Sequence, residues 1–325
     1  MHFGLTEEQQ MMQDVARNFA ENEILPDLED DEANHRFRPE LLKKMGELSF
    51  FACALPEEYG GNGFGYLESV ILAEQIAKVS GSWRVPFNMQ NLGPPITVAK
   101  FGNEEQKRRF IPGWTSGETI GFFAMTEPNT GSDVASMGTT ASDRGDHWEL
   151  NGQKMWISNA HVGDWGLLYA FTDKSQKHKG MSCFIINLKE TEGITTTAIE
   201  SKLGLHCAPT GEIVFDGAKI PKDSVLGEVG QGFQICMWQL NNTRIGCAAG
   251  ALGIAGGAVA AAIDYANTRT QFGQKIGAYQ MVQAQIADMV AEHEAARLLV
   301  YRAAWLKDQG LPNQHETSIA KLFAS

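Results

Sequence analysis

The stretch FAMTEPNTGSD, residues 123–133, lies where the character of the sequence changes. It overlaps the apolar run GFFAM, residues 121–125, and continues into hydroxyl, amide and turn-forming side chains between Thr126 and Ser132. Residues of these types build polar loops, because they bond to nearby backbone and tolerate turn conformations. We expect a strand followed by a loop that either holds a ligand through hydroxyls and free amides or is a solvated turn.

Residues 1–118, which lead up to this loop, are predicted to form an N-terminal helical domain. Thr6 suits the N-cap of a first helix over residues 5–25, which has acidic residues in its first turn and apolar residues at helical spacing. Further helical patterns cover residues 39–52, 66–80 and 104–114, and Pro112 with Gly113 is expected to close the last one.

Residues 119–225 change to the strand period and are predicted to form a middle antiparallel β domain. The pair Asn151-Gly152 lies between HWEL, residues 147–150, and QKMW, residues 153–156, and indicates a hairpin turn within that stretch. The strand patterns cover residues 121–125, 147–158, 165–173, 181–188 and 211–220.

Residues 226–325 return to helical patterns, over residues 232–272, 279–310 and 313–325. The last pattern reaches Ser325 without a C-cap, so we expect that the chain is cut short. Residues 245–263 form an uncharged run of nineteen residues, long enough to span a bilayer. Because most of them are Ala and Gly, which favour insertion weakly, we predict a buried helix with close neighbours and no membrane insertion. The fold class is α+β.

Composition narrows the function. The chain has 325 residues, 43% of them apolar, and a net charge of −12, which argues against a nucleic-acid surface and requires any polyanionic ligand to find a local basic site. The five cysteines form no CxxC pair and no secretory signal begins at Met1, so we expect a reduced interior compartment without a disulfide framework or metal cluster.

Three further patterns could bind a ligand. Trp156 and Ser158 stand two apart on a strand and so project to one face, where they could flank a flat heteroaromatic ring. Arg269 and Phe272 could hold a phosphate and a stacked ring. The polar group from Gln239 to Arg244 lies in an apolar helix and needs a partner. Taken singly, each also fits a structural role: a core tryptophan, a surface arginine, or a subunit contact.

Together these motifs, with ALPEEYGG at residues 54–61 and FGNEEQKRRFIPGWTSGE at residues 101–118, resemble the acyl-CoA dehydrogenase family along the chain from Leu5 to its last residue. The resemblance implies a C-terminal four-helix bundle, incomplete here, and the domain limits 1–118, 119–225 and 226–325. It also implies FAD as cofactor, an acyl-CoA substrate, electron-transfer flavoprotein as electron acceptor, a homotetramer, and a location in the cytoplasm or, in a eukaryote, the mitochondrial matrix.

The resemblance also implies roles for single residues. Residues expected to hold FAD are Phe123, Met125, Thr126, Ser132, Trp156, Ile157, Ser158, Arg269, Gln271, Phe272 and Gln280. Of these, Arg269 and Gln280 are expected at the pyrophosphate and adenosine side of the FAD in a neighbouring subunit. Residues expected to contact the acyl-CoA are Arg84, Val85, Ser132, Leu240, Asn241, Asn242, Thr243 and Arg244. No catalytic residue is expected in this chain, because the family's glutamate base lies beyond Ser325 or, in some relatives, at the position of Thr243.

The implied reaction is α,β-dehydrogenation: a base takes the Cα proton while hydride leaves Cβ for flavin N5. Arg84 suggests a substrate with a distal carboxylate, because a guanidinium can clamp a carboxylate and glutaryl-CoA dehydrogenases carry a charge at the end of this helix. The motif NNTR at residues 241–244 is similar to their NNAR. The alternative role for Arg84 is a structural ion pair. Alternative substrates are short-chain, alicyclic or benzylsuccinyl-type acyl-CoA esters. Alternative functions are an oxidase or monooxygenase on the same fold and a non-catalytic acyl-CoA-binding relative. His206, Ala208 and Pro209 depart from the family pattern and receive no role.

Overall fold

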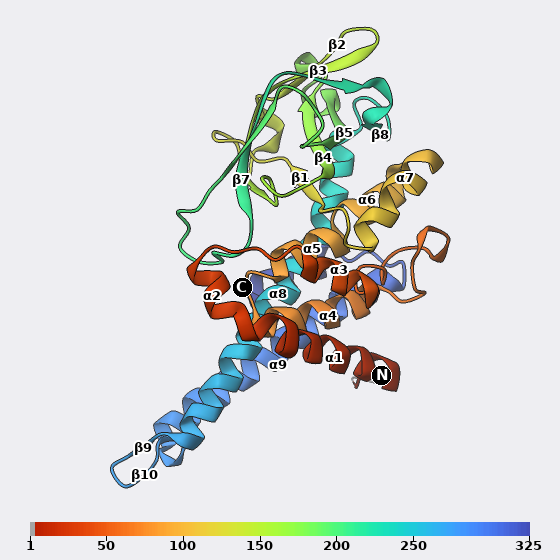
Figure 1. Ribbon diagram of the computed structural model, residues 1–325. Coiled ribbons are helices and arrows are strands. Elements are labelled where there is room, and N and C mark those ends of the chain that lie inside the picture. The colour runs from red at the N-terminus through yellow and green to blue at the C-terminus, as the bar shows by residue number, and fades with distance from the viewer. Residues whose placement is uncertain (1–3) are drawn as a thin grey trace. The chain divides into compact units, whose positions relative to one another are not determined.

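The computed structural model describes residues 4–325, with helices toward both ends of the chain and a β-sheet in its middle (Figure 1). This order confirms the predicted α+β class. By packing, the chain divides into two compact units. The unit here called the helical unit contains residues up to 28, 65–84 and 244–325, and the sheet unit contains residues 29–64 and 85–243.

The helical unit is assembled from segments that lie far apart in the sequence. Thr6 Oγ1 accepts a hydrogen bond from the backbone of Gln9 at 3.2 Å, and the Gln9 side chain accepts one from the Thr6 backbone, so the predicted N-cap is confirmed. The helices are α1 (Glu7–Phe19), α4 (Tyr66–Val79), most of α8 (Gly232–Thr268), α9 (Gln280–Asp308) and α10 (Gln314–Ala324).

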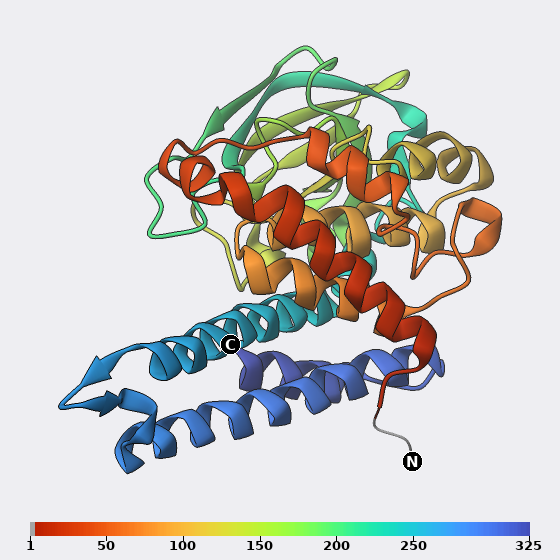
Figure 2. The same cartoon turned by 60° about the horizontal axis from the view of Figure 1, so that its bottom comes forward.

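Glycines allow α8 to approach α4 closely. A Cβ atom on Gly253 would lie 2.3 Å from the backbone oxygen of Glu74, and one on Gly257 would lie 2.3 Å from that of Lys78. No side chain fits at such distances, so glycine at these positions sets the separation of the two helices. Among the described residues α8 is the one helix long and apolar enough to cross a membrane. Its contacts with α4 fit the closely packed bundle helix that its composition predicts, and Figure 2 shows it running alongside α9.

The end of α9 caps the beginning of α4. The residue before α4 is Gly65, which has no side chain to accept from the first backbone N–H groups. The Asp308 carboxylate accepts from the backbone of Tyr66 at 2.7 Å and of Leu67 at 3.0 Å. A negative charge at a helix N-terminus is favourable, so Asp308 ties together two helices that lie more than two hundred residues apart.

Helices of the sheet unit position the strand that leads to the candidate site. Gln90 accepts a hydrogen bond from the Gly121 backbone at 2.6 Å, and the Trp114 indole donates to the Trp165 carbonyl at 3.1 Å. Against the prediction, α7 runs through Pro112, because a proline near a helix end removes one hydrogen bond and the next turn still forms. The helices grouped here are α2 (Leu28–Ala33), α3 (Glu40–Glu47), α5 (Arg84–Leu92), α6 (Pro94–Phe101) and α7 (Glu104–Thr115).

The sheet has the order β6-β7-β3-β2-β4-β5-β8, and β1 pairs with β4 (Figure 1). Its strands are β1 (Phe122–Ala124), β2 (Thr140–Asp143), β3 (His147–Ser158), β4 (Trp165–Phe171), β5 (Met181–Asn187), β6 (Ile194–Ala198), β7 (Thr210–Pro221) and β8 (Val225–Leu226). Most pairs are antiparallel as predicted, but β1 pairs in parallel with β4, and so does β2 through Thr140.

Asn151-Gly152 does not form the predicted hairpin. Both residues lie inside β3, which pairs with β7 from one end to the other, and a register shift at Leu150/Asn151 marks a bulge. Strand pairing on both sides carries the chain straight on, and the Asn151 side chain accepts from the Gly217 backbone at 2.9 Å.

The predicted helix over residues 232–272 is too long at its end. It stops at Thr268, and a short hairpin of β9 (Thr270–Gln271) and β10 (Gln274–Lys275) follows. Phe272 at its turn has a φ of 50°, which a helix does not allow, and Gly273 follows with a φ of 81°. The three predicted domain limits follow the sequence and the two units follow packing, so the limits after residues 118 and 225 stay predictions.

Candidate functional site

The polar loop after β1 and the end of β3 lie side by side. The backbone N–H of Met155 donates to the Thr126 carbonyl at 2.9 Å, and Lys154 Nζ donates to the Met125 carbonyl at 3.0 Å. The structure therefore brings together the two segments that the sequence singled out. Phe123, Met125 and Thr126 belong to the first segment, and Trp156, Ile157 and Ser158 to the second.

The loop turns back on itself immediately after Thr126. Glu127 and Thr130 exchange backbone hydrogen bonds at 2.9 and 3.2 Å, which closes a tight turn over Pro128 and Asn129. Thr130 Oγ1 is buried and has no hydrogen-bond partner. Ser132 lies beyond the turn with its side chain exposed. The loop thus presents hydroxyl groups that the protein itself does not use.

A second bulge in β3 aims Trp156. The pairing with β7 shifts register between Lys154 and Ile157, and Trp156 has a φ of 61°. A left-handed backbone is costly for any residue with a Cβ, and such strain concentrates at binding sites. Its indole is 55% exposed, whereas Ile157 is buried in the sheet core. Trp156 is therefore turned to the exposed side of the strand, and Ser158, on the other side of Ile157 in the sequence, is partly exposed.

The donors of this site are available to a ligand. In the described part of the chain, the hydroxyls of Thr126, Ser132 and Ser158 have no hydrogen-bond partner. An exposed indole beside unused hydroxyls suits a flat heteroaromatic ring with a polar edge. The Met125 carbonyl is bonded to Lys154, and its sulfur lies 3.2 Å from the Cys236 sulfur.

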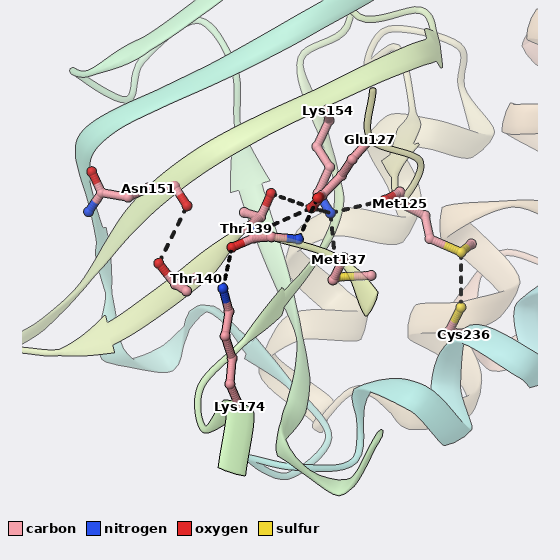
Figure 3. A network of polar contacts seen from close by, with 10 residues as sticks. Met125, Glu127, Met137, Thr139, Thr140, Asn151, Lys154, Lys174 and Cys236 are labelled. Carbon is pink, nitrogen blue, oxygen red and sulfur yellow. Dashed lines mark hydrogen bonds and ion pairs between the residues drawn. The ribbon is translucent and has the colours of Figure 1, made fainter. Parts of the chain in front are cut away.

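Beneath the loop lies a buried ion pair that sequence reasoning missed (Figure 3). Lys154 Nζ is 2.9 Å from Glu127 Oε1, with Lys154 fully buried and Glu127 8% exposed. The Glu127 carboxylate also accepts from the backbone of Gly138 and from both the backbone and the hydroxyl of Thr139, the latter at 2.6 Å. The available signal was strand alternation, which places Lys154 on the same inward face as Trp148 and Leu150 and so demands a partner.

The two charges of this pair respond differently to burial. Burial lowers the pKa of Lys154 to about 8, although Glu127 raises it, so the ammonium stays protonated at neutral pH. Burial alone would raise the pKa of Glu127, but the Lys154 charge and the donors from Thr139 and Gly138 lower it below its ordinary value. At neutral pH both groups are ionised.

The start of α8 carries the predicted substrate residues. Gln239 is fully buried; its amide oxygen accepts from the Tyr169 hydroxyl at 2.6 Å, whereas its Nε2 is buried without a hydrogen-bond partner. Asn242 and Thr243 bond back to α8 carbonyls, at 2.8 and 3.2 Å. Leu240, Asn241 and Arg244 are partly exposed.

Arg84 has no carboxylate partner among the described residues. It is the first residue of α5, rather than the end of a helix as expected, with Val85 beside it. Its guanidinium donates to the Cys247 sulfur at 3.7 Å, and its Nε is buried without a partner. A Cβ atom on Gly250 of α8 would lie 2.5 Å from Arg84 Cδ, so the side chain occupies space that only glycine leaves open. The alternative of a structural ion pair therefore finds no support.

The remaining predicted cofactor residues lie in the helical unit. Arg269, Gln271 and Gln280 are exposed at the β9–β10 hairpin or the start of α9, and the Phe272 ring is 95% exposed. The Arg269 guanidinium has no acidic partner in the part of the chain that the structure describes. These side chains are available for contacts outside their own unit.

The helical unit also contains a cavity of about 560 Å³, which none of the predicted residues lines. In its wall, Glu74 accepts from Tyr301 at 2.7 Å and pairs with Arg297 at 3.1 Å.

Comparisons with known proteins agree with this geometry. Models of the acyl-CoA dehydrogenase N-terminal, middle and C-terminal domains match residues 6–118, 122–218 and 230–325. Glutaryl-CoA dehydrogenase of Desulfococcus multivorans is 46% identical over 328 residues, covering 100% of this chain and 84% of that protein. The mitochondrial short-chain specific acyl-CoA dehydrogenase of Bos taurus is 42% identical, covering 99% of this chain and 78% of that protein.

Solved structures show the same fold. A glutaryl-coenzyme A dehydrogenase in complex with glutaryl-CoA has a TM-score of 0.96 at 44% identity, covering 100% of this chain and 83% of that one. A chain in a structure described as the electron transferring flavoprotein of Acidaminococcus fermentans has a TM-score of 0.97 at 41% identity, covering 100% and 85%. PigA with FAD and proline has a TM-score of 0.94 at 29% identity, covering 100% and 85%.

Proposed function

Because this chain belongs to the acyl-CoA dehydrogenase family, we propose that it catalyses the FAD-dependent α,β-dehydrogenation of an acyl-CoA that carries a distal carboxylate, such as glutaryl-CoA. The observation that carries the proposal is the meeting of the Thr126 loop and the Trp156 strand beside unused hydroxyls. The substrate class rests on Arg84, and the two parts can be tested separately.

The residues of the loop and strand fit FAD as the cofactor. The hydroxyls of Thr126 and Ser158 would donate to the polar edge of the flavin ring, and the Trp156 indole would cover one side of it. Arg269 would bind the pyrophosphate, because a guanidinium with no internal partner matches phosphate oxygens. When bound, FAD supplies the acceptor for the Cβ hydride. Fixed donors at a developing charge contribute about a hundredfold or more in rate.

Arg84 would bind the carboxylate at the far end of the acyl chain. A guanidinium that stays unpaired inside a protein is unfavourable, and a carboxylate ligand would supply the missing charge and accept from the buried Nε. Ser132 and the residues from Leu240 to Arg244 would contact the rest of the acyl-CoA.

Anaerobic mixing with a panel of CoA esters tests the reaction. We expect glutaryl-CoA to bleach the flavin absorbance of the FAD-loaded protein faster than butyryl-CoA does. In Arg84→Met, KM for glutaryl-CoA should rise at least tenfold while KM for butyryl-CoA changes little, since the lost contact is with the carboxylate. Arg302→Met, which removes an exposed arginine paired with Glu316, is the matched control. Equal effects of Arg84→Met on both esters contradict the carboxylate role.

Partner and assembly extend the proposal. The similarity to a chain in an electron transferring flavoprotein structure supports electron-transfer flavoprotein as acceptor. Exposed Arg269, Phe272 and Gln280 support a homotetramer in which they reach the FAD of a neighbouring copy. Relatives from a bacterium and from mitochondria support the cytoplasm or the mitochondrial matrix as the location.

A plain short-chain acyl-CoA is the second candidate substrate, favoured by the similarity to short-chain specific dehydrogenases. Faster bleaching by butyryl-CoA than by glutaryl-CoA selects it. Rapid reaction of the reduced protein with oxygen indicates an oxidase, and a protein that stays colourless when FAD is supplied indicates a non-catalytic relative.

A further inference from the structure

We propose that the buried Lys154–Glu127 pair is a positioning element that locks the Thr126 loop and the Trp156 bulge together as one rigid receptor for the flavin. The inference rests on the proposed function, because it concerns how this chain's own residues hold that cofactor. It assigns a role to two charged residues that do not themselves face the ligand.

The pair connects the two segments at the point where both turn toward the site. Glu127 directly follows Thr126, and Lys154 stands two residues before Trp156. One ammonium group bonds to the Met125 carbonyl at 3.0 Å and to Glu127 at 2.9 Å (Figure 3). The residues on both sides of Thr126 are therefore held by a single side chain from β3, Met125 through its backbone carbonyl and Glu127 through its carboxylate.

The far side of the pair fixes the return of the loop. Glu127 accepts from the backbone of Gly138 and from Thr139, residues that lead into β2, so the carboxylate gathers both ends of the loop around itself. The Met155 backbone binds the Thr126 carbonyl at 2.9 Å. This bond holds the Thr126 backbone, and the Thr126 hydroxyl has no hydrogen-bond partner among the described residues.

Packing alone gives little reason for charges here. A buried ion pair loses solvation that its attraction only partly restores, and apolar residues of equal size are often neutral or stabilising in its place. The pair does supply directional hydrogen bonds. The Glu127 carboxylate accepts from three donors and the Lys154 ammonium donates to one carbonyl, so the pair holds four groups of the loop in defined positions. Fixed positions of the loop and strand matter because the hydroxyls of Thr126 and Ser158 must point to the polar edge of the flavin ring.

The experiment separates positioning from simple stability. Lys154→Met leaves one buried charge alone and should unfold more easily, whereas the double variant Lys154→Met with Glu127→Gln removes both charges and should recover most of the lost melting temperature. Lys174→Met is the matched control, because Lys174 also bonds to this loop, at the Gly138 carbonyl 2.9 Å away, but is exposed. Thr139→Val, which removes only one donor to Glu127, is a milder variant that should fold in every case.

For each variant we would measure the melting temperature without FAD, the dissociation constant of FAD, and the visible circular dichroism of the bound flavin. We expect the double variant to melt near the wild type yet to bind FAD at least tenfold more weakly and with an altered flavin band. Thr139→Val should change the FAD dissociation constant and the flavin band in the same direction, but by less. Lys174→Met should match the wild type. A double variant with wild-type FAD affinity and flavin band overturns the proposal. A wild-type protein without FAD affinity contradicts the proposed function instead.

Discussion

Trp156 combines an exposed aromatic ring with a backbone angle that disfavours any side chain. Glycine tolerates a φ of 61°, whereas alanine at this angle is strained by about 1 kcal/mol. We therefore expect FAD-free Trp156→Gly to be more stable than Trp156→Ala by about 1 kcal/mol in urea unfolding. This order is the reverse of the usual one for strands, where glycine is the weaker residue.

The same exchange at Glu149, an ordinary position of β3 whose side chain is partly exposed, is the control. There, alanine should be the more stable of the two variants. If Trp156→Ala is also more stable than Trp156→Gly, the backbone of the bulge is not strained.

Glu127 links stability to acid pH. Its pKa in the folded protein lies below the ordinary value of 4.5, so the unfolded chain takes up its proton first as the pH falls. The stabilisation is fully present above about pH 4.5 and is lost as the pH drops through the lower folded value.

Glu127→Gln should therefore cost roughly 3 kcal/mol of unfolding free energy at pH 7, and less as the pH approaches 3. Urea unfolding across this range measures both effects, and Glu105→Gln, on the exposed side of α7, is the control. A cost that stays constant with pH contradicts the assigned ionisation.

At the residue scale, sequence analysis singled out the unbonded hydroxyls and the exposed indole of the candidate site, but not the charges beneath them. Thr126, Trp156 and Ser158 were found because hydroxyls and an indole in loop and strand-end positions are recognisable by type. Lys154 and Glu127 were missed, since their pairing depends on two segments meeting in space, although strand alternation already placed Lys154 inside.

At the scale of elements, the contact of α8 with α4 depends on a missing side chain. In Gly253→Val the new atoms would overlap the Glu74 carbonyl, where a Cβ already lies at 2.3 Å. The helices must move apart, so we expect a loss of about 3 kcal/mol of unfolding free energy or more. Ala261→Val, on an exposed part of the same helix, should cost less than about 1 kcal/mol. Similar losses in both variants would mean that the close approach is unimportant.

Element types were predictable where one period runs without interruption, as in α1 and α4. The errors fell where a local signal competed with tertiary pairing. Asn151-Gly152 favours a turn, but β7 pairs with β3 on both sides of it and carries the strand through. The predicted helix extended four residues beyond the end of α8 at Thr268, because the apolar pattern contains no signal for the left-handed backbone at Phe272.

At the scale of the whole molecule, sequence order and packing divide the chain differently. Three family models match three consecutive stretches, whereas α1 and α4 pack in one unit with the C-terminal helices. Sequence patterns report on residues that are close along the chain, so they do not predict that the Asp308 carboxylate caps α4. Such long-range ties are set by topology and are invisible to periodicity.

The bare ring of Phe272 makes the hairpin between α8 and α9 a natural target for chymotrypsin, which cleaves after exposed aromatic residues in non-helical backbone. Other exposed aromatics, such as Tyr265 and Trp305, lie within helices that resist the enzyme. In dilute, FAD-free protein we expect the first nick after Phe272, detected by mass spectrometry. Raising the protein concentration and adding FAD should slow this cleavage selectively, because contacts with neighbouring copies would cover the hairpin. The rate of cleavage after Phe272 would then report on oligomerisation. A first cut elsewhere would show that the hairpin is already shielded in the single chain.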